Sequence, residues 1–188
     1  MNFNIPNALT WARIVMIPLV LAVFYLPAEV LSLPMQNLVA CTLFIIAAVT
    51  DWFDGWLARR LGLTSAFGAF LDPVADKLMV CAALVLLVWL GRCNAVLAFI
   101  IIGRELTISA LREWMAQIGK TKSVAVSFIG KLKTTAQMVA IPMLLYFDDL
   151  AGLPIYRIGS VLMIVAVLLT LWSMVYYMRR ALAVIDER

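Results

Sequence analysis

Long apolar runs alternate with short polar or turn-forming segments along the whole chain. A helix that crosses the hydrocarbon core of a membrane needs about 20 mainly apolar residues. Six runs meet this requirement, and they cover residues 8–26, 36–58, 70–90, 94–115, 130–147 and 155–178. The pattern therefore predicts an all-α integral membrane protein with six transmembrane helices. A single membrane domain would span residues 1–188 and begin with a short interfacial segment at 1–7.

Composition supports this class and limits the chemistry. The chain is 65% hydrophobic and 14% charged, whereas soluble domains are about 45–50% apolar and about 25% charged. The net charge of +4 does not indicate a nucleic-acid partner, because the basic residues gather at predicted helix ends. Three scattered cysteines are typical of packing residues. The chain has no histidine, so its chemistry must use carboxylates, Lys, Arg and hydroxyl groups.

The distribution of Lys and Arg predicts the orientation. Cytoplasmic connections of membrane proteins carry an excess of these residues. An orientation with the N-terminus inside places most basic residues on the cytoplasmic side, namely Arg59, Arg60, Lys120, Lys122, Arg179, Arg180 and Arg188. In that orientation both termini are cytoplasmic, and so is the connection between the second and third helices.

Two acidic groups flank that connection. Residues spaced by three, four or seven positions share one face of a helix. The two groups are Asp51, Asp54, Gly55 and Ala58, and then Gly68, Asp72 and Asp76. Ionisable residues at membrane depth cost roughly 2.5–3.5 kcal/mol and usually serve function. Two helices therefore bring four carboxylates together beside small residues that leave room for a ligand.

Carboxylate oxygens without Cys or His favour Mg²⁺ or Mn²⁺. Four Asp residues have the capacity for two ions, and Mg²⁺ typically completes its shell with water and substrate phosphates. A phosphate-bearing substrate is the natural partner. Two structural alternatives stay open. The small residues also suit close helix packing, and the aspartates also suit ion pairs with Arg59, Arg60 or Lys77.

The order D-x-x-D-G-x-x-A-R, followed by G-x-x-x-D-x-x-x-D, resembles the signature of the CDP-alcohol phosphatidyltransferases. Every signature position is filled, by Asp51, Asp54, Gly55, Ala58 and Arg59, and then by Gly68, Asp72 and Asp76. Segments 4–13, 104–115 and 123–134 extend the resemblance to members of the family that use glycerol 3-phosphate. The likeness covers essentially the whole chain.

The resemblance implies a metal-dependent transfer of a phosphatidyl group from CDP-diacylglycerol to sn-glycerol 3-phosphate, which yields phosphatidylglycerol phosphate and CMP. It implies that Asp51, Asp54 and Asp72 bind metal, and that Asp76 lies near a second ion and acts as base on the acceptor hydroxyl. The resemblance also implies a site for CDP-diacylglycerol, to which we assign Gly55, Ala58, Arg59, Gly68, Thr10 and Arg13.

The phosphate of this acceptor requires Arg or Lys donors. Arg104 and Arg112 lie on neighbouring faces of the fourth predicted helix, and Lys131 and Lys133 begin the fifth. We expect these four residues to bind it, with Glu105 pairing to Arg104 or a neighbour. The alternative for the lysines is contact with anionic lipid headgroups.

Several rival functions remain open from sequence. Other acceptors of the family are inositol phosphate, serine and phosphatidylglycerol. An intramembrane prenyltransferase also uses aspartates and Mg²⁺, but with a different Asp spacing. A cation channel or transporter would need polar residues to continue across the membrane, whereas 39–49 and 78–90 are apolar. The resemblance further implies a homodimer. We expect it in the bacterial inner membrane with lipid as neighbour, and the charge distribution predicts a cytoplasmic active site and no nucleic acid partner.

Overall fold

The computed structural model of this chain describes residues 5–61, 66–119 and 128–186. Some side chains within these ranges lie outside the described part, and among them are those of Asp54, Gly55, Ala58, Arg59 and Lys131. The helical elements of these ranges are α1 (Ile5–Ala22), the 3₁₀ helix η1 (Val23–Tyr25), α2 (Leu33–Leu61), α3 (Ala66–Trp89), α4 (Ala95–Gln117), α5 (Phe128–Tyr146) and α6 (Ile155–Asp186). Outside these helices, the backbone pairing found among the described residues is an isolated β-bridge between Leu150 and Leu153. The all-α prediction is therefore confirmed for this part of the chain.

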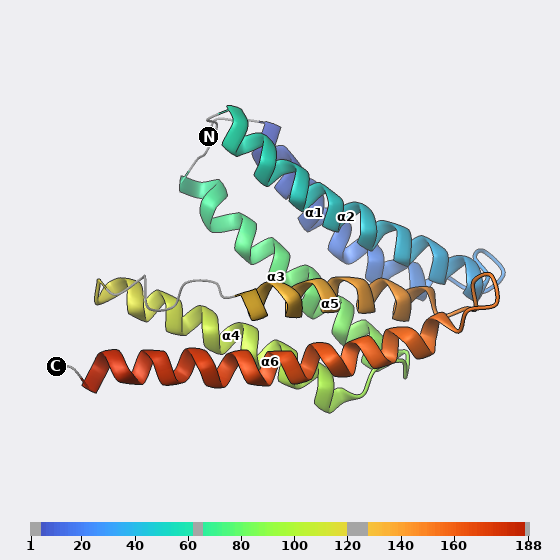
Figure 1. Ribbon diagram of the computed structural model, residues 1–188. Helices are drawn as coiled ribbons and strands as arrows, with labels where there is room; N and C mark the ends of the chain where they lie inside the picture. The colour runs from blue at the N-terminus through green and yellow to red at the C-terminus, as the bar shows by residue number, and fades with distance from the viewer. Residues whose placement is uncertain (1–4, 62–65, 120–127, 187–188) are drawn as a thin grey trace.

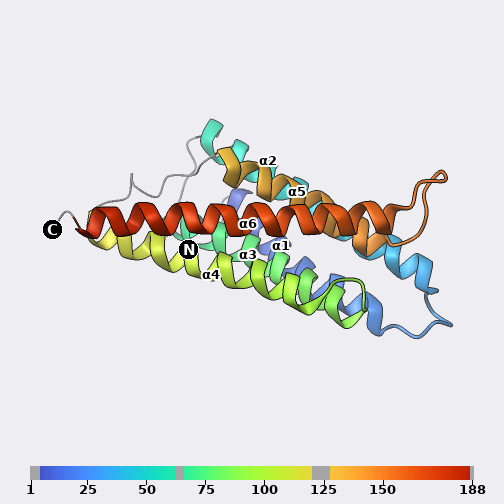
Figure 2. The same cartoon turned by 60° about the horizontal axis from the view of Figure 1, so that its bottom comes forward.

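Successive helices run in opposite directions, so the helices form an up-and-down bundle (Figure 1). One end of the bundle, the terminal end, holds both chain termini. The opposite end, the loop end, holds the connections α1–α2, α3–α4 and α5–α6, and Figure 2 shows the same division. Helix α5 packs along α6, α1 lies against both α2 and α3, and α4 packs against α6.

The helices extend beyond several of the predicted boundaries. Helix α1 begins at residue 5, inside the predicted interfacial segment 1–7. Helix α2 has 29 residues, which at 1.5 Å per residue makes it about 44 Å long, more than the roughly 30 Å of a hydrocarbon core. Its apolar part ends at Asp51. The first acidic motif therefore begins where the helix emerges from its apolar span.

The surface of the bundle suits lipid. Two described segments are long and apolar enough to cross a membrane, Leu33–Asp51 and Ile155–Arg179, and a shorter apolar helix covers Thr10–Tyr25. Large apolar side chains such as Phe99 and Leu168 point outward and are more than half exposed. Apolar surface on this scale is typical of membrane or protein contact. Both features agree with a membrane protein, and the count of six spans stays a prediction.

A glycine ends α3 and turns the chain back into the bundle. Gly91 has φ of +70°, a left-handed conformation that glycine adopts without steric cost. The backbone N–H of Arg92 then bonds to the carbonyl of Leu87 at 2.8 Å, as in the common glycine-terminated helix end. On the other side of the turn, Asn94 caps α4 by accepting a bond from the Val96 N–H at 2.8 Å.

The turn places Arg92 at the centre of the loop end, where it is buried. Its guanidinium donates to the Leu145 carbonyl at 2.8 Å and to Asn37 Oδ1 at 2.7 Å. It also lies 4.4 Å from the centre of the Phe147 ring, and Asn37 in turn donates to Asp148 at 3.1 Å. Burial lowers the pKa of the Arg92 guanidinium, and the Asp148 carboxylate raises it. This loop-end clasp joins α2, the α3–α4 turn and the α5–α6 connection.

Candidate active site

The acidic residues lie on either side of the α2–α3 connection, as the sequence predicts. Asp51 lies on α2, and Asp72 and Asp76 lie one turn apart on α3. All three side chains are partly exposed. The other predicted residues of the first motif belong to α2, but their side chains lie outside the described ones, namely Asp54, Gly55, Ala58 and Arg59. Their roles stay predictions.

Arg13 of α1 forms an ion pair with Asp51. The Arg13 side chain is completely buried, whereas the Asp51 side chain is 40% exposed. A buried guanidinium requires a compensating anion, because an unpaired charge in a low-dielectric interior is costly. The contact therefore explains how α1 carries a cation into the bundle, and it assigns Arg13 a carboxylate partner that the sequence analysis did not anticipate.

Thr10 lies one turn before Arg13 on the same face of α1. Its hydroxyl donates to Asp72 Oδ1 at 2.7 Å, and Thr10 is buried. Helix α1 thus contacts one carboxylate on α2 and one on α3. Gly68 is buried at the start of α3. The predicted contacts of Thr10, Arg13 and Gly68 with CDP-diacylglycerol stay predictions.

Asp76 lies near charged residues of three other helices. The charges of Asp51, Arg13 and Glu105 are all near enough to act on its carboxylate. Glu105 belongs to α4, so Asp76 lies between the acidic motif and the fourth helix. This position brings the proposed base close to both halves of the predicted site.

The described carboxylates suit a hard divalent cation, although too few of them lie together to enclose one. Asp51, Asp72 and Asp76 offer carboxylate oxygens, and the chain contains no histidine. Among the described residues, no group of three acidic or thiol side chains lies close enough to enclose an ion. Mg²⁺ needs only one or two carboxylates when water and phosphate complete its shell. The residues present therefore fit such an ion.

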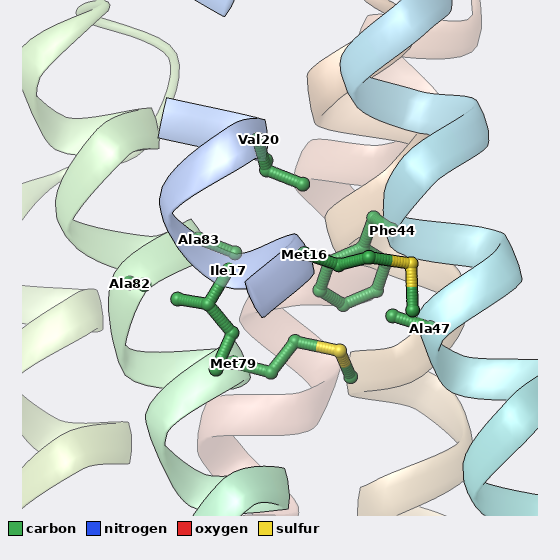
Figure 3. Close-up of a pocket in the computed structure, with 8 residues that line it drawn as sticks. All are labelled: Met16, Ile17, Val20, Phe44, Ala47, Met79, Ala82 and Ala83. Atoms are coloured by element: carbon green, nitrogen blue, oxygen red, sulfur yellow. The ribbon is translucent and has the colours of Figure 1, made fainter. Parts of the chain in front are cut away.

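An apolar layer lies directly beneath the carboxylates, towards the loop end. Met79 is one turn after Asp76 on α3, and Ala47 is one turn before Asp51 on α2. A void of about 10 Å³ lies between α1, α2 and α3 at this level, and Figure 3 shows the side chains around it. They are Met16, Ile17, Val20, Phe44, Ala47, Met79, Ala82 and Ala83. A space this small holds at most about one water molecule, so these side chains leave little room between the three helices, and we call the layer the apolar floor.

A buried basic cluster lies on α4 and α5. Lys133 is 2% exposed and Arg104 is 7% exposed, and both contact Glu105, which is 21% exposed. Arg104 Nη1 donates to Glu105 Oε1 at 2.9 Å, and Lys133 Nζ donates to the same oxygen. The prediction that Glu105 pairs with Arg104 is confirmed. Its second partner, Lys133, brings two of the four predicted acceptor-binding residues together.

Helix α6 completes the surroundings of this cluster. Arg104 Nη2 donates to Ser173 Oγ at 3.3 Å. The guanidinium groups of Arg104 and Arg112 lie 6.0 Å and 5.8 Å from the ring centre of the buried Tyr177. Arg112 is exposed, and the side chain of Lys131 lies outside the described ones.

The sequence analysis missed the contribution of α6. Ser173 and Tyr177 lie one turn apart and both contact the basic cluster. A signal was present, because Thr170 and Ser173 are the hydroxyl-bearing residues of an otherwise apolar run from Val161 to Val175. Their buried positions show that this polar face of α6 points into the bundle.

The family model described as CDP-alcohol phosphatidyltransferase matches residues 3–172. The chain belongs to this family. The matched region of this CDP-alcohol phosphatidyltransferase includes both acidic groups and the basic cluster on α4 and α5. The resemblance inferred from the signature residues is therefore confirmed.

Relatives from three bacteria are similar to this CDP-alcohol phosphatidyltransferase over nearly their full length. Proteins of Shigella flexneri serotype 5b (strain 8401) and Escherichia coli (strain K12) are 49% identical to it, over 97% of each chain. A protein of Salmonella choleraesuis (strain SC-B67) is 49% identical over 96% of each chain. All three carry the name CDP-diacylglycerol–glycerol-3-phosphate 3-phosphatidyltransferase.

Proposed function

We propose that this enzyme transfers the phosphatidyl group of CDP-diacylglycerol to sn-glycerol 3-phosphate, giving phosphatidylglycerol phosphate and CMP. The names of its relatives support this reaction. The observation that carries the proposal is the packing of a helix with carboxylates against two helices with a buried basic cluster. Helix α3 carries Asp72 and Asp76 and contacts both α4 and α5, which hold Arg104, Glu105 and Lys133. A phosphorylated alcohol presents its hydroxyl and its phosphate to two such groups.

Metal binding is assigned to Asp51, Asp54, Asp72 and Asp76. When bound, two Mg²⁺ or Mn²⁺ ions would neutralise the diphosphate and stabilise the CMP leaving group. Arg13 and Thr10 hold two of these carboxylates from α1. Gly55, Ala58, Arg59 and Gly68 are assigned to the cytidine-diphosphate pocket, where small residues allow the ligand to approach the helix backbone.

Asp76 is proposed as the general base. It removes the proton from the acceptor hydroxyl, and the resulting oxygen attacks the phosphorus that carries the diacylglycerol. The bond from this phosphorus to its bridging oxygen breaks, and the electron pair leaves with CMP. The apolar floor limits water on one side of the carboxylates, and the acceptor hydroxyl, bound on the open side, is the proposed attacking group.

Arg104, Arg112, Lys131 and Lys133 are proposed to bind the acceptor phosphate. Two of them are already buried and held together by Glu105. Arg112 is exposed, so it is available to close over the phosphate from the solvent side. Buried and exposed cations together would bind a dianion more strongly than a neutral alcohol.

We place the protein in the bacterial inner membrane as a homodimer with six transmembrane helices. The terminal end, with both termini and the acidic motif, is assigned to the cytoplasm. The excess of Lys and Arg at this end supports the assignment. The lipid substrate would reach the site from the surrounding membrane.

The decisive experiment measures CMP release by purified protein in detergent, with CDP-diacylglycerol, Mg²⁺ and a panel of alcohols. We expect release that depends on glycerol 3-phosphate and stops with EDTA. Release with inositol phosphate, serine or phosphatidylglycerol instead would keep the family chemistry and overturn the acceptor. Glu113→Gln, an exposed change on α4, provides a control that should match the parent protein.

A further inference from the structure

Glu105 holds two cations from two different helices on a single oxygen. Arg104 is its neighbour on α4, whereas Lys133 is 28 residues away on α5, and both bond to Oε1. The two cations are more than nine-tenths buried. A buried pair that only joined α4 to α5 would need one cation and one anion. The second cation therefore leaves an excess of positive charge inside the bundle.

That excess matches one chemical group. The cluster of Arg104, Lys133 and Glu105 carries a net charge of +1, and Arg112 lies beside the shared ring of Tyr177. The nearest further anion is the Asp76 carboxylate on α3, so the cations still outnumber the anions. Burying uncompensated charge is costly unless a ligand completes the pairing. A phosphate monoester near neutral pH carries up to two negative charges. Its oxygens would supply the negative charge that the excess cations lack.

The donor geometry fits the same group. Two donor nitrogens that contact a common carboxylate oxygen are also close enough to contact the oxygens of one phosphate. Arg104 Nε is buried and has no hydrogen-bond partner among the described residues. Arg104 is oriented by Ser173 through Nη2, so the position of the guanidinium is fixed from two sides. The cluster thus offers a preformed arrangement of donors.

We propose that Glu105 is a positioning residue, which holds Lys133 and Arg104 together as a cradle for the acceptor phosphate. Glu105 thereby makes the enzyme select alcohols that carry a phosphate monoester over alcohols that do not. This inference rests on the proposed function, since it concerns the acceptor of that reaction. Lys133 and Arg104 contact the phosphate, and Glu105 acts through them.

Glu105→Gln tests the role because it keeps the shape of the side chain and removes its charge. We expect KM for glycerol 3-phosphate to rise by about tenfold or more, as for loss of a hydrogen bond to a charged group. KM for CDP-diacylglycerol should change less than about twofold, on the same scale. Glu113→Gln is the matched control on α4, since its carboxylate is exposed. Glu105→Asp, which keeps the charge on a shorter side chain, should recover part of the lost affinity.

Inorganic phosphate is the probe that separates this inference from the proposed function. In the parent protein it should compete with glycerol 3-phosphate but not with CDP-diacylglycerol, and Glu105→Gln should weaken that inhibition in parallel with KM. An unchanged KM in folded Glu105→Gln would reduce the residue to a structural role. A lower KM would mean that Glu105 competes with the phosphate, which also overturns the proposal.

Two further results complete the test. If the parent protein ignores glycerol 3-phosphate, the proposed acceptor fails, and phosphate protection against thermal unfolding still tests the cradle. Protection that is equal in the parent and in Glu105→Gln would contradict it. If Glu105→Gln does not fold, KM for glycerol 3-phosphate is compared between Glu105→Asp and the parent protein instead. An unchanged KM in Glu105→Asp would overturn the positioning role of Glu105.

Discussion

Thr10 and Asp72 show how one hydroxyl can orient a site. The Thr10 hydroxyl bonds to Asp72 Oδ1 at 2.7 Å from a buried position on α1. This bond fixes the direction in which the carboxylate presents Oδ2. Groups that orient metal-binding side chains typically influence affinity by about 10–100-fold. If Asp72 binds metal as proposed, Thr10 would act on the ion without touching it.

Thr10→Val removes the hydroxyl and keeps the branched shape. We expect the Mg²⁺ concentration for half-maximal activity to rise by about tenfold, and Mn²⁺ binding measured by electron paramagnetic resonance to weaken with it. Thr42→Val is the control, because the Thr42 hydroxyl is exposed and bonds within its own helix to the Leu38 carbonyl. Unchanged Mn²⁺ binding in Thr10→Val would remove Thr10 from the metal site.

Asp76→Asn tests the proposed base. The amide has almost the shape of the carboxylate but cannot accept the proton of the hydroxyl, so we expect turnover to fall by about 10²–10⁴-fold, the usual contribution of general base catalysis. CDP-diacylglycerol should still bind in an equilibrium binding assay. Asp149→Asn, at an exposed position beyond α5, should behave as the parent. Substantial residual turnover in Asp76→Asn would exclude its role as base.

Arg112→Ala separates the acceptor from the lipid substrate. Arg112 is exposed beside Tyr177, so its loss should weaken phosphate binding with little effect on folding. We expect KM for glycerol 3-phosphate to rise by roughly tenfold, as for one charge-assisted hydrogen bond, and KM for CDP-diacylglycerol to stay near its parent value. Arg157→Ala, also exposed, is the control. Equal changes in both constants would contradict the assignment.

Single residues were predictable where the chemistry is local. The shared face of Asp72 and Asp76 on α3 follows from their spacing of four residues, whereas the role of Asp51, Asp72 and Asp76 as ligands stays a prediction. The ion-pair partner of Asp51 was not predictable from spacing. Arg13 lies 38 positions earlier in the chain, and its contact with Asp51 depends on how α1 packs. Lys133 and Glu105 were likewise identified as separate residues, but their contact requires the relative placement of α4 and α5.

At the scale of helices, the pairing of α5 and α6 depends on a glycine. A Cβ added at Gly159 would lie 3.0 Å from Met143 Cβ and 3.3 Å from Leu144. Met143 Cβ is fixed to its backbone and cannot rotate away. Small residues allow membrane helices to approach in this way. The absence of a side chain at this position thus sets the distance between the two helices.

Gly159→Ala should destabilise the protein by about 1–3 kcal/mol, the usual cost of overpacking. Gly103→Ala is the matched control within α4, where an added Cβ meets nothing within 4 Å. There the exchange should be neutral or stabilise the helix by roughly 0.5–1 kcal/mol. Thermal unfolding in detergent compares the two variants. Equal stability of both would show that α5 and α6 are able to separate slightly without cost.

Helix positions were largely predictable, and helix ends were less so. The six apolar runs correspond in order to α1 through α6. The ends differ because a hydropathy pattern records the apolar span, whereas a helix continues as long as its backbone bonds are made. Helix α2 illustrates this difference, since its apolar part ends at Asp51 and the helix continues to Leu61.

For the whole molecule, the up-and-down arrangement places both termini at one end, in agreement with an even number of crossings (Figure 1). The proposed orientation puts that end in the cytoplasm. Single cysteines in a variant without Cys41, Cys81 and Cys93 test it. Asp149→Cys at the loop end should react with a membrane-impermeant maleimide in intact cells. Gln117→Cys should react only after the membrane is permeabilised, and the reverse pattern would invert the topology.

The apolar floor between α1, α2 and α3 bears on how well the membrane keeps its voltage and proton gradient. Phe44 and Met79 fill the bundle just beyond the carboxylates. A bacterial membrane stores energy as a difference in voltage and proton concentration, and any continuous chain of water across it would drain that store. A catalyst that keeps several acidic groups within the membrane needs insulation on its far side. In the proposed orientation, the floor separates the carboxylates from the loop end, so lipid synthesis would proceed without discharging the membrane in which it takes place.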